Sequence, residues 1–183
     1  MPQDKNHLMQ GQADGLCGLY CIINFLSASV TDYRKDYAKY DLWHLLTIFQ
    51  QFGWLSPQSV YEGFEDYQLK LIFNQHCENR KLSFRAYFLK DYVEYHKLGE
   101  LSDAAESLTD SSISISQKNA IFAYNTKEDH WVMIHRSDNK LFISDSQLAN
   151  PRDFEPDKKD DGLCSDPGLI ILPKDRQLSG MFS

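Results

Sequence analysis

The sequence has no segment in which Lys or Arg is concentrated. Its 183 residues contain 19 Lys and Arg against 26 Asp and Glu, which gives a formal net charge of −7. Nucleic acids and anionic membrane surfaces are bound through clusters of basic side chains that neutralise phosphate groups. The charge balance therefore argues against nucleic acid as a partner and against binding to an anionic membrane surface.

Long hydrophobic runs are also missing. The longest mainly apolar stretch, 16–26, is interrupted by Asn24 and is much shorter than the roughly 20 residues that cross a bilayer. No membrane span is expected. The opening segment MPQDKNHLMQ is polar and has no apolar core of the kind found in secretory signal peptides. We therefore expect a cytoplasmic protein, or one that is exported by a route independent of a signal peptide.

Cysteine is scarce. The four cysteines lie at positions 17, 21, 77 and 164, too few and too unevenly spaced for a disulfide-stabilised scaffold of this length. A zinc half-site at Cys17 and Cys21 would need a second pair of Cys or His at chelating spacing, and the sequence offers none. We therefore expect no metal and no cofactor.

The sequence does contain enough apolar residues for one folded domain. Hydrophobic residues make up 42% of the chain and aromatic residues 13%, and no linker or repeat divides residues 1–183. The first half has helical periodicity. Three helices are expected there: 17–27, which is apolar on every side; 41–52, with Asp41 as its cap; and 57–79, with Ser56 as N-cap and Pro57 in the first turn.

In the rest of the chain, the spacing of apolar residues changes from that of helices to that of strands. Alternating or apolar segments bounded by turn residues predict strands over 82–88, 120–125, 130–136, 140–145 and 168–172. The polar stretch 97–118 predicts a surface connection, and 146–167 predicts a charged loop that is a candidate substrate-shaping lid. The expected fold class is α+β, with one buried helix packed on an antiparallel sheet.

Cys17 is the first residue of the expected buried helix, within the sequence QADGLCGLYCIINFL. Backbone N–H groups and the helix dipole at that position favour a thiolate. Gly15 and Gly18 flank the cysteine and suit a backbone that closely approaches a substrate. Gln12 lies five residues upstream and could donate an amide N–H to an oxyanion. Taken alone, Cys17 also fits an inert core residue.

A second group of polar residues lies where two expected strands form a hairpin. A two-residue turn at 138–139 would pair Val132 with Asp145. His130 would then lie on the same face, diagonal to Asp145, which could accept one ring N–H and leave the other nitrogen toward a thiol. A loop one residue longer or shorter would place the two on opposite faces. His135 has the opposite parity and is expected to be a half-buried strand residue.

The order Gln12, Cys17, His130, Asp145 resembles that of the papain-like cysteine peptidases. The stretches QADGLCGLYCIINFL and DHWVMIHRSDNKLFISD are most similar to Josephin-type deubiquitinases and, a step further, to the double-glycine leader peptidases of bacterial exporters. In the Josephin pattern a Gln precedes a Leu-Cys pair, a Cys and an Asn follow on the same helix, and His-Trp opens a strand. The matching residues are Gln12, Leu16, Cys17, Cys21, Asn24, His130 and Trp131. Asp145 stands where Josephin domains carry Asn.

The resemblance implies a papain-like fold and a thiol hydrolase that cleaves a peptide or isopeptide bond. In that family Cys17 would be the nucleophile, His130 would carry the proton, and Asp145 would orient His130. Gln12 and the backbone N–H of Cys17 would hold the oxyanion. A protein or peptide substrate is implied, with a ubiquitin-like protein as one option, and a bacterial effector that cleaves a host protein is one biological setting.

Three alternatives remain open from the residues alone. A transglutaminase-type acyltransferase would use the same side chains but pass the acyl group to an amine. A non-catalytic binding module would use the same cleft without chemistry. An unrelated cytosolic domain would leave Cys17 inert, which thiol reactivity would reveal.

Overall fold

The computed structural model describes residues 15–99, 101–107, 119–137, 140–148, 151–155 and 162–174. Its helices are α1 (Cys17–Ser29), α2 (Lys35–Gln51), α3 (Pro57–Glu62), α4 (Asp66–Asn79), α5 (Leu89–Tyr95) and α6 (Leu101–Ser107). Its strands are β1 (Phe84–Phe88), β2 (Ala120–Asn125), β3 (His130–Ser137), β4 (Lys140–Asp145), β5 (Arg152–Asp153) and β6 (Leu163–Pro173). The predicted α+β class is confirmed.

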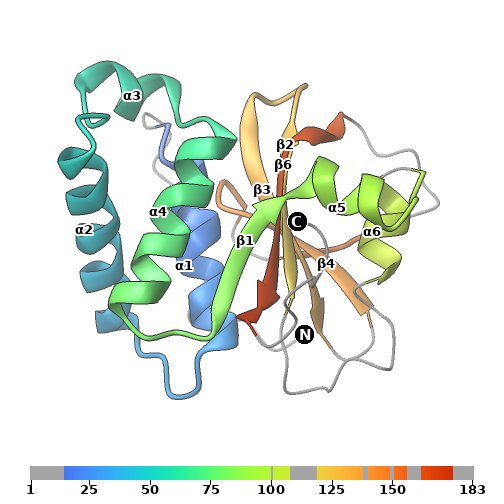
Figure 1. Cartoon of the computed structure of the whole chain (residues 1–183), viewed down its shortest axis with the longest axis horizontal. Coiled ribbons are helices and arrows are strands. Elements are labelled where there is room, and N and C mark those ends of the chain that lie inside the picture. The colour runs from blue at the N-terminus through green and yellow to red at the C-terminus, as the bar shows by residue number, and fades with distance from the viewer. Residues whose placement is uncertain are drawn as a thin grey trace.

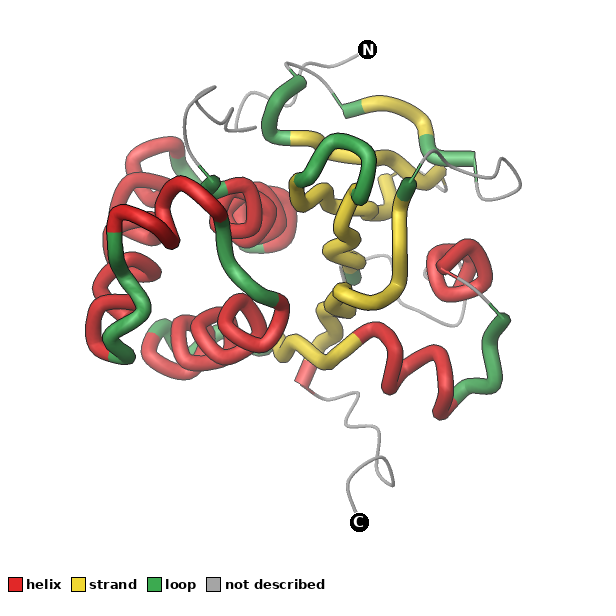
Figure 2. The backbone as a smooth tube through the Cα atoms, turned by 90° about the horizontal axis from the view of Figure 1, so that it is seen from above, coloured by secondary structure: helices red, strands yellow, loops and turns green. Residues whose placement is uncertain are grey.

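The strands form one six-stranded sheet in the order β1-β6-β2-β3-β4-β5, and every neighbouring pair is antiparallel. Helices α1 to α4 lie on one side of the sheet (Figure 1), and α5 and α6 lie on the other (Figure 2). The edge strand β1 is covered by Asn74 of α4, whose Oδ1 accepts from the N–H of Ala86 at 2.7 Å and whose Nδ2 donates to its carbonyl at 3.1 Å. This contact occupies backbone groups that an open sheet edge would leave exposed.

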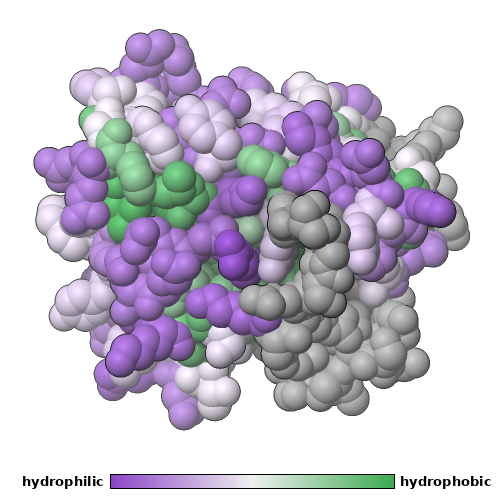
Figure 3. All heavy atoms as spheres, in the orientation of Figure 1, coloured by the Kyte–Doolittle hydropathy of each residue, from purple (hydrophilic) through white to green (hydrophobic). Residues whose placement is uncertain are grey.

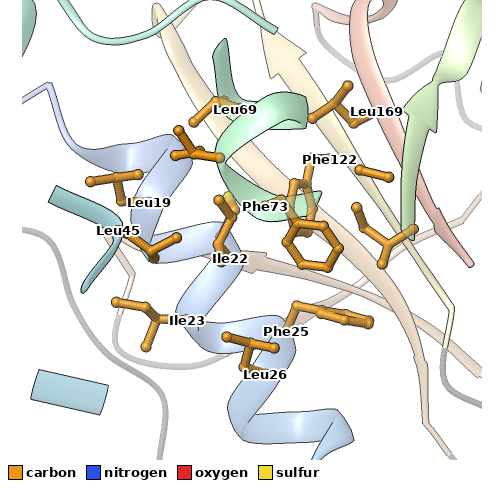
Figure 4. Packing of buried hydrophobic residues seen from close by; sticks show 14 of the residues in the cluster. Leu19, Ile22, Ile23, Phe25, Leu26, Leu45, Leu69, Phe73, Phe122 and Leu169 are labelled. Atoms are coloured by element: carbon orange, nitrogen blue, oxygen red, sulfur yellow. The ribbon is translucent and has the colours of Figure 1, made fainter. Parts of the chain in front are cut away.

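Helix α1 lies at the centre of the larger core. Its apolar side chains point both toward α2 and α4 and toward the sheet (Figure 4). The ring of Phe25 lies edge-on to those of Phe73 and Phe122, with centroids 5.8 and 6.3 Å away. Burying each such side chain contributes about 1.5–3 kcal/mol, so the helix is fixed firmly against the sheet. The position of its first residue, Cys17, is fixed with it.

A second, smaller core fills the opposite face of the sheet. It joins α5 and α6 to the sheet through Leu89, Ala104, Ala105, Ile121, Ile134 and Ile170. Since successive strand residues alternate between faces, Ile134 of β3 belongs to this core, whereas its neighbour Met133 belongs to the core around α1.

Two predicted helix boundaries are wrong. The helix α2 begins at Lys35, so Asp41 is a buried interior residue and not a cap. The expected helix 57–79 is broken into α3 and α4 at Gly63, whose φ of 93° is in the left-handed region that favours glycine. The predicted start of α3 is confirmed, because the hydroxyl of Ser56 accepts from the N–H of Ser59 at 3.1 Å.

The strands predicted over 120–125, 130–136 and 140–145 are confirmed, with β3 one residue longer, and the strand expected over 82–88 begins at Phe84. The strand expected over 168–172 begins earlier, at Leu163, inside a stretch predicted to be a loop. That stretch, 146–167, also contains the short strand β5. The connection expected over 97–118 contains α6. Within the described residues, no helix is long and apolar enough to cross a membrane.

Candidate active site

Cys17 is the first residue of α1 and lies against the start of β3. Its side chain is only 4% exposed. The backbone N–H of Trp131 donates to the Cys17 Sγ atom at 3.3 Å, across 114 positions in the chain. The residue before Trp131 is His130, so the fold brings the predicted nucleophile and the predicted proton carrier to neighbouring positions.

The loop that leads into Cys17 is held by α3 and α4. The N–H of Gly15 donates to the carbonyl of Val60 at 2.6 Å, and a Cβ on Gly15 would lie 2.5 Å from the backbone nitrogen of Gly63. A Cβ on Gly18 would lie 2.6 Å from the side chain of Leu69. Both glycines are thus needed for close packing of the chain on itself, and their approach to a substrate stays a prediction. They allow the N-terminus of α1 to pack closely against α3 and α4.

His130 and Asp145 meet at the same end of the sheet. Val132 pairs with Asp145, as the two-residue turn predicts, although residues 138–139 themselves lie outside the described residues. The His130 Nε2 atom lies 3.1 Å from Oδ2 of Asp145. The other ring nitrogen, Nδ1, lies 3.4 Å from the carbonyl oxygen of Glu128. The predicted contact between the two side chains is thus present.

The surroundings of this pair favour its charged form. Burial opposes ionisation of His130, but the nearby carboxylate of Asp145 and the carbonyl and carboxylate of Glu128 outweigh it and raise the pKa of His130 above its usual value. Burial likewise opposes ionisation of Asp145, but His130, the N–H of Gln147 and the charge of Arg152 lower the Asp145 pKa. The Gln147 N–H donates to Oδ1 at 2.8 Å. An imidazolium beside a carboxylate is the favoured state.

The turn between β2 and β3 holds His130 in place. The Asn125 Oδ1 atom accepts from the N–H groups of Lys127 and Glu128 at 3.0 and 3.3 Å. Asp129, directly before His130, has a φ of 56°. Its carboxylate accepts a hydrogen bond from the hydroxyl of Tyr124. Such local bonds fix the chain where it enters β3.

Sequence reasoning missed three contributors to the site. Glu128 Oε2 lies 3.8 Å from His130 Nε2. The ring of Tyr124 lies edge-on to that of Trp131, with centroids 5.5 Å apart, and the Trp131 indole N–H donates to the carbonyl of Phe64 at 3.1 Å. Only the proximity of Glu128 to His130 in the sequence gave a signal. The contacts of Tyr124 and Phe64 depend on strand pairing and on the placement of α4.

The remaining predicted residues divide into two groups. Gln12, the expected oxyanion donor, lies outside the described residues, as does Gln10, a second glutamine upstream of Cys17. His135 is half-buried as expected, with Nε2 2.9 Å from the hydroxyl oxygen of Ser144 and its ring stacked on Phe142. It takes no part in the contact between His130 and Asp145.

Among the residues that the structure describes, Glu128, His130 and Asp145 are the group that could hold a metal ion. One ligand atom from each lies within 4.8 Å of the others. Asp145 already contacts Nε2 of His130, so an ion would have to replace that contact. The arrangement fits a proton-carrying pair better than a metal centre.

The other cysteines differ from Cys17 in their surroundings. Burial raises the pKa of Cys77 to about 12, and it raises the pKa of Cys164 as well. Burial, followed by the nearby Cys17 and Asp145, raises the pKa of Cys21. All three thiols are therefore held in the neutral, unreactive form.

The chemistry of this site is a thiol at the first turn of a buried helix, near a histidine whose pKa is raised by a neighbouring carboxylate. A comparison of the chain with protein-family models, with curated proteins and with solved structures finds no match. Function is therefore inferred from the residues of the site and from their surroundings.

Proposed function

We propose that the protein is a papain-like cysteine hydrolase that cleaves a peptide or isopeptide bond in a protein substrate. One observation carries the proposal: the Sγ atom of Cys17 accepts a hydrogen bond from the N–H of Trp131, directly after His130, whose Nε2 lies 3.1 Å from Asp145. A nucleophile, a base and a group that orients the base are the parts that covalent acyl transfer requires.

In the first half of the reaction, the proton of the Cys17 thiol passes to His130, which leaves a thiolate beside an imidazolium. The thiolate attacks the carbonyl carbon, a C–S bond forms, and the π electrons of the carbonyl move to its oxygen. The backbone N–H of Cys17 and the side chain of Gln12 donate to that oxyanion. The oxyanion then collapses, the C–N bond breaks, and His130 gives its proton to the departing amine.

In the second half, water releases the acyl group. His130 accepts a proton from the water, whose oxygen attacks the thioester carbonyl. The C–S bond breaks, the carboxylic acid leaves, and the Cys17 sulfur regains a proton from His130. Asp145 keeps Nε2 of His130 in place throughout and stabilises the imidazolium. The raised pKa of His130 supports this role, since a protonated ring stabilises the thiolate.

The buried position of the cluster also supports the proposal. Cys17, His130 and Asp145 are exposed by 4%, 3% and 4% respectively. Hydrogen bonds and charges act more strongly there than in water. A cytoplasmic location, or export independent of a signal peptide, stays a prediction.

A panel of electrophilic probes tests the proposed function. It contains peptides, ubiquitin and ubiquitin-like proteins, each ending in a vinyl sulfone that captures a reactive thiol. We expect a covalent adduct on Cys17 with at least one probe, and none in the Cys17→Ala variant. A full panel without an adduct on Cys17 would contradict the proposal.

The same experiments identify whether water or an amine accepts the acyl group from Cys17. The substrate that matches the captured probe is incubated with and without a labelled primary amine. Release of a free carboxylate in the presence of the amine supports hydrolysis. Transfer of the label to the acyl group would replace hydrolysis by transglutaminase-type acyl transfer.

A further inference from the structure

Exposed apolar side chains are concentrated on the helical side of the molecule. Among the described residues, the large exposed ones between residues 40 and 71 are Tyr40, Trp43, Phe52, Tyr61, Tyr67 and Leu71, whereas only Tyr95 and Leu148 lie elsewhere. Figure 3 shows hydrophobic side chains gathered over the upper part of α2 and α4. Such a concentration is typical of a surface that binds another molecule.

Three aromatic rings form a continuous row on this side. The ring of Phe52 stacks on Trp54 with centroids 4.8 Å apart, and Trp54 lies edge-on to Tyr67 at 5.7 Å. Tyr67 is 50% exposed and Phe52 is 43% exposed. The row therefore presents ring faces and edges to a partner while its inner ring, Trp54, packs on the core residue Phe49.

The charge beside this row is mainly negative. Lys70, three residues after Tyr67 on α4, lies with its Nζ atom 3.7 Å from the ring centroid of Phe88. Residues 40–69 contain Asp41, Glu62, Glu65 and Asp66 but no Lys or Arg. Asp41 is buried, whereas Glu62 and Glu65 are exposed. We call Phe52, Trp54, Tyr67, Glu62 and Glu65 the α3–α4 face. Carboxylates and aromatic faces both attract Lys and Arg side chains.

The α3–α4 face adjoins the cysteine site. The carbonyl of Phe64, directly before Glu65, accepts the indole N–H of Trp131 at 3.1 Å. Burial raises the pKa of Tyr124; the bond and charge of Asp129 raise it further, as do the charges of Cys17 and Glu65. Glu65 on the helical side and Asp129 on the sheet side thus both act on the hydroxyl of Tyr124, which also feels the charge of Cys17.

We propose that the α3–α4 face binds a segment of the protein substrate that carries Lys or Arg next to an apolar or aromatic residue, and so guides that substrate to Cys17. The inference deepens the proposed function and rests on it. The basic side chains would contact Glu62 and Glu65 and the ring of Tyr67, while the apolar residue would cover Phe52. The partner's chemistry follows from the exposed carboxylates of Glu62 and Glu65 and from the aromatic rings of this face.

Peptide binding to the full chain tests this inference. The chain carries Cys17→Ala, so that no probe is cleaved during the measurement. The probes are fluorescent peptides of twelve residues with two Leu and one Phe, and with either four Arg or four Glu. We expect the Arg peptide to bind about tenfold tighter or more at low salt, and the difference to shrink as salt is added.

Matched surface variants locate the binding. Tyr67→Ala and Glu62→Lys should each weaken binding of the Arg peptide about tenfold. Tyr95→Ala and Glu94→Lys, on α5 across the sheet, should leave it unchanged. Equal binding of the two peptides, or equal losses in the α5 variants, would overturn the inference. Self-association of the chain that Tyr67→Ala abolishes and the Arg peptide does not displace would also overturn it, by assigning the face to a second copy.

The two proposals fail separately in these experiments. A vinyl sulfone adduct on Cys17 without preference for the Arg peptide removes the inference and keeps the hydrolase. Preferential binding of the Arg peptide without any adduct on Cys17 removes the hydrolase and leaves a binding surface without the proposed role in catalysis.

Discussion

Two buried clusters in this molecule combine histidine with aspartate, and they differ in what surrounds them. In the first, His130 and Asp145 lie at the end of the sheet, beside the residue whose N–H contacts Cys17. The second lies between α2 and α4 and is built around Asp41.

The second cluster ties helices together. Asp41 Oδ1 lies 2.6 Å from Arg80 Nη1 and 3.4 Å from His76 Nε2, and Asp41 Oδ2 accepts from the hydroxyl of Tyr33 at 2.7 Å. His76 Nδ1 in turn lies 2.8 Å from Nδ1 of His44. Each nitrogen of the buried His76 ring therefore has a polar neighbour, and the chain of contacts runs from one helix to the other.

The pKa values of His44 in the second cluster and His130 in the first are shifted in opposite directions. Burial and then the charge of His76 lower the pKa of His44, and Arg80 adds to this effect while Asp41 opposes it. The carboxylates near His130 outweigh burial and raise its pKa. A raised pKa favours the protonated ring that stabilises a thiolate, whereas a lowered pKa favours the neutral ring that can share a hydrogen bond between helices. Adjacency of His and Asp therefore does not by itself identify a catalytic pair.

The largest expected effect is a loss of catalytic activity that is confined to variants of the first cluster. We expect His130→Ala to lower kcat/KM by about 10²–10⁴, the usual contribution of a general acid–base group. His44→Ala and His135→Ala should stay close to the unaltered chain. The measurement is turnover of the substrate identified with the probe panel, with thermal unfolding curves to establish that each variant is folded. An inactive His135→Ala beside an active His130→Ala would contradict the assignment.

A smaller loss is expected for the oxyanion donor. Gln12→Ala should lower kcat by about 10²–10³, or about 2.7–4 kcal/mol, with KM nearly constant, because the donor acts once charge develops on the carbonyl oxygen. Alkylation of Cys17 forms no oxyanion, so its rate should stay unchanged and serves as the control. If Gln10→Ala shows the loss and Gln12→Ala does not, the role belongs to Gln10.

The second cluster should matter for stability and not for activity. We expect Asp41→Ala to lower the free energy of unfolding by about 2–4 kcal/mol, because it leaves the buried groups of Tyr33 and His76 without their acceptor. Asp36→Ala, at an exposed position of α2, should change it little. Urea denaturation measures both. A variant Asp41→Ala as stable as Asp36→Ala would contradict a stabilising role for this cluster.

The smallest expected effect is on histidine titration. In titrations followed by NMR, the pKa of His130 should lie above the usual value of ~6.5 and that of His44 below it. The contribution of His130 to stability is then present below ~6.5 and lost as pH rises through its raised pKa. That of His44 is present above ~6.5 and lost as pH falls toward its lowered pKa. A reversed order of the two titrations would remove the distinction between the clusters.

The sequence could predict the first cluster because its geometry follows from a short hairpin. A two-residue turn and the alternation of strand residues fix the pairing of Val132 with Asp145, and hence the face of His130. The buried helix α1 was predictable for a similar reason, since it is apolar on every side. In both cases, the spacing of residues within one short segment is sufficient to predict the structure.

The second cluster could not be predicted in the same way. Asp41 is a residue type favoured at helix caps, and nothing near it in the sequence marks it as buried. Its partner Arg80 lies 39 positions away, so only the packing of α2 on α4 brings them together. The break at Gly63 was missed because apolar residues continue the helical spacing across it. Leu163 and Cys164 at the start of β6 are separated from its apolar end by the sequence SDPG. They pair with β2 beyond an irregularity at Ala123 and Tyr124, which no periodicity indicates.

The relative reactivity of the four cysteines shows whether Cys17 is the nucleophile and whether His130 activates it. Brief, substoichiometric labelling with iodoacetamide near neutral pH, followed by peptide mass mapping, compares them in one sample. We expect Cys17 to be labelled far faster than the others and His130→Ala to slow this reaction, while Cys21 and Cys77, with their raised pKa values, stay nearly unlabelled. Dominant labelling at Cys164 or Cys77, or a rate at Cys17 that His130→Ala leaves unchanged, would contradict these roles.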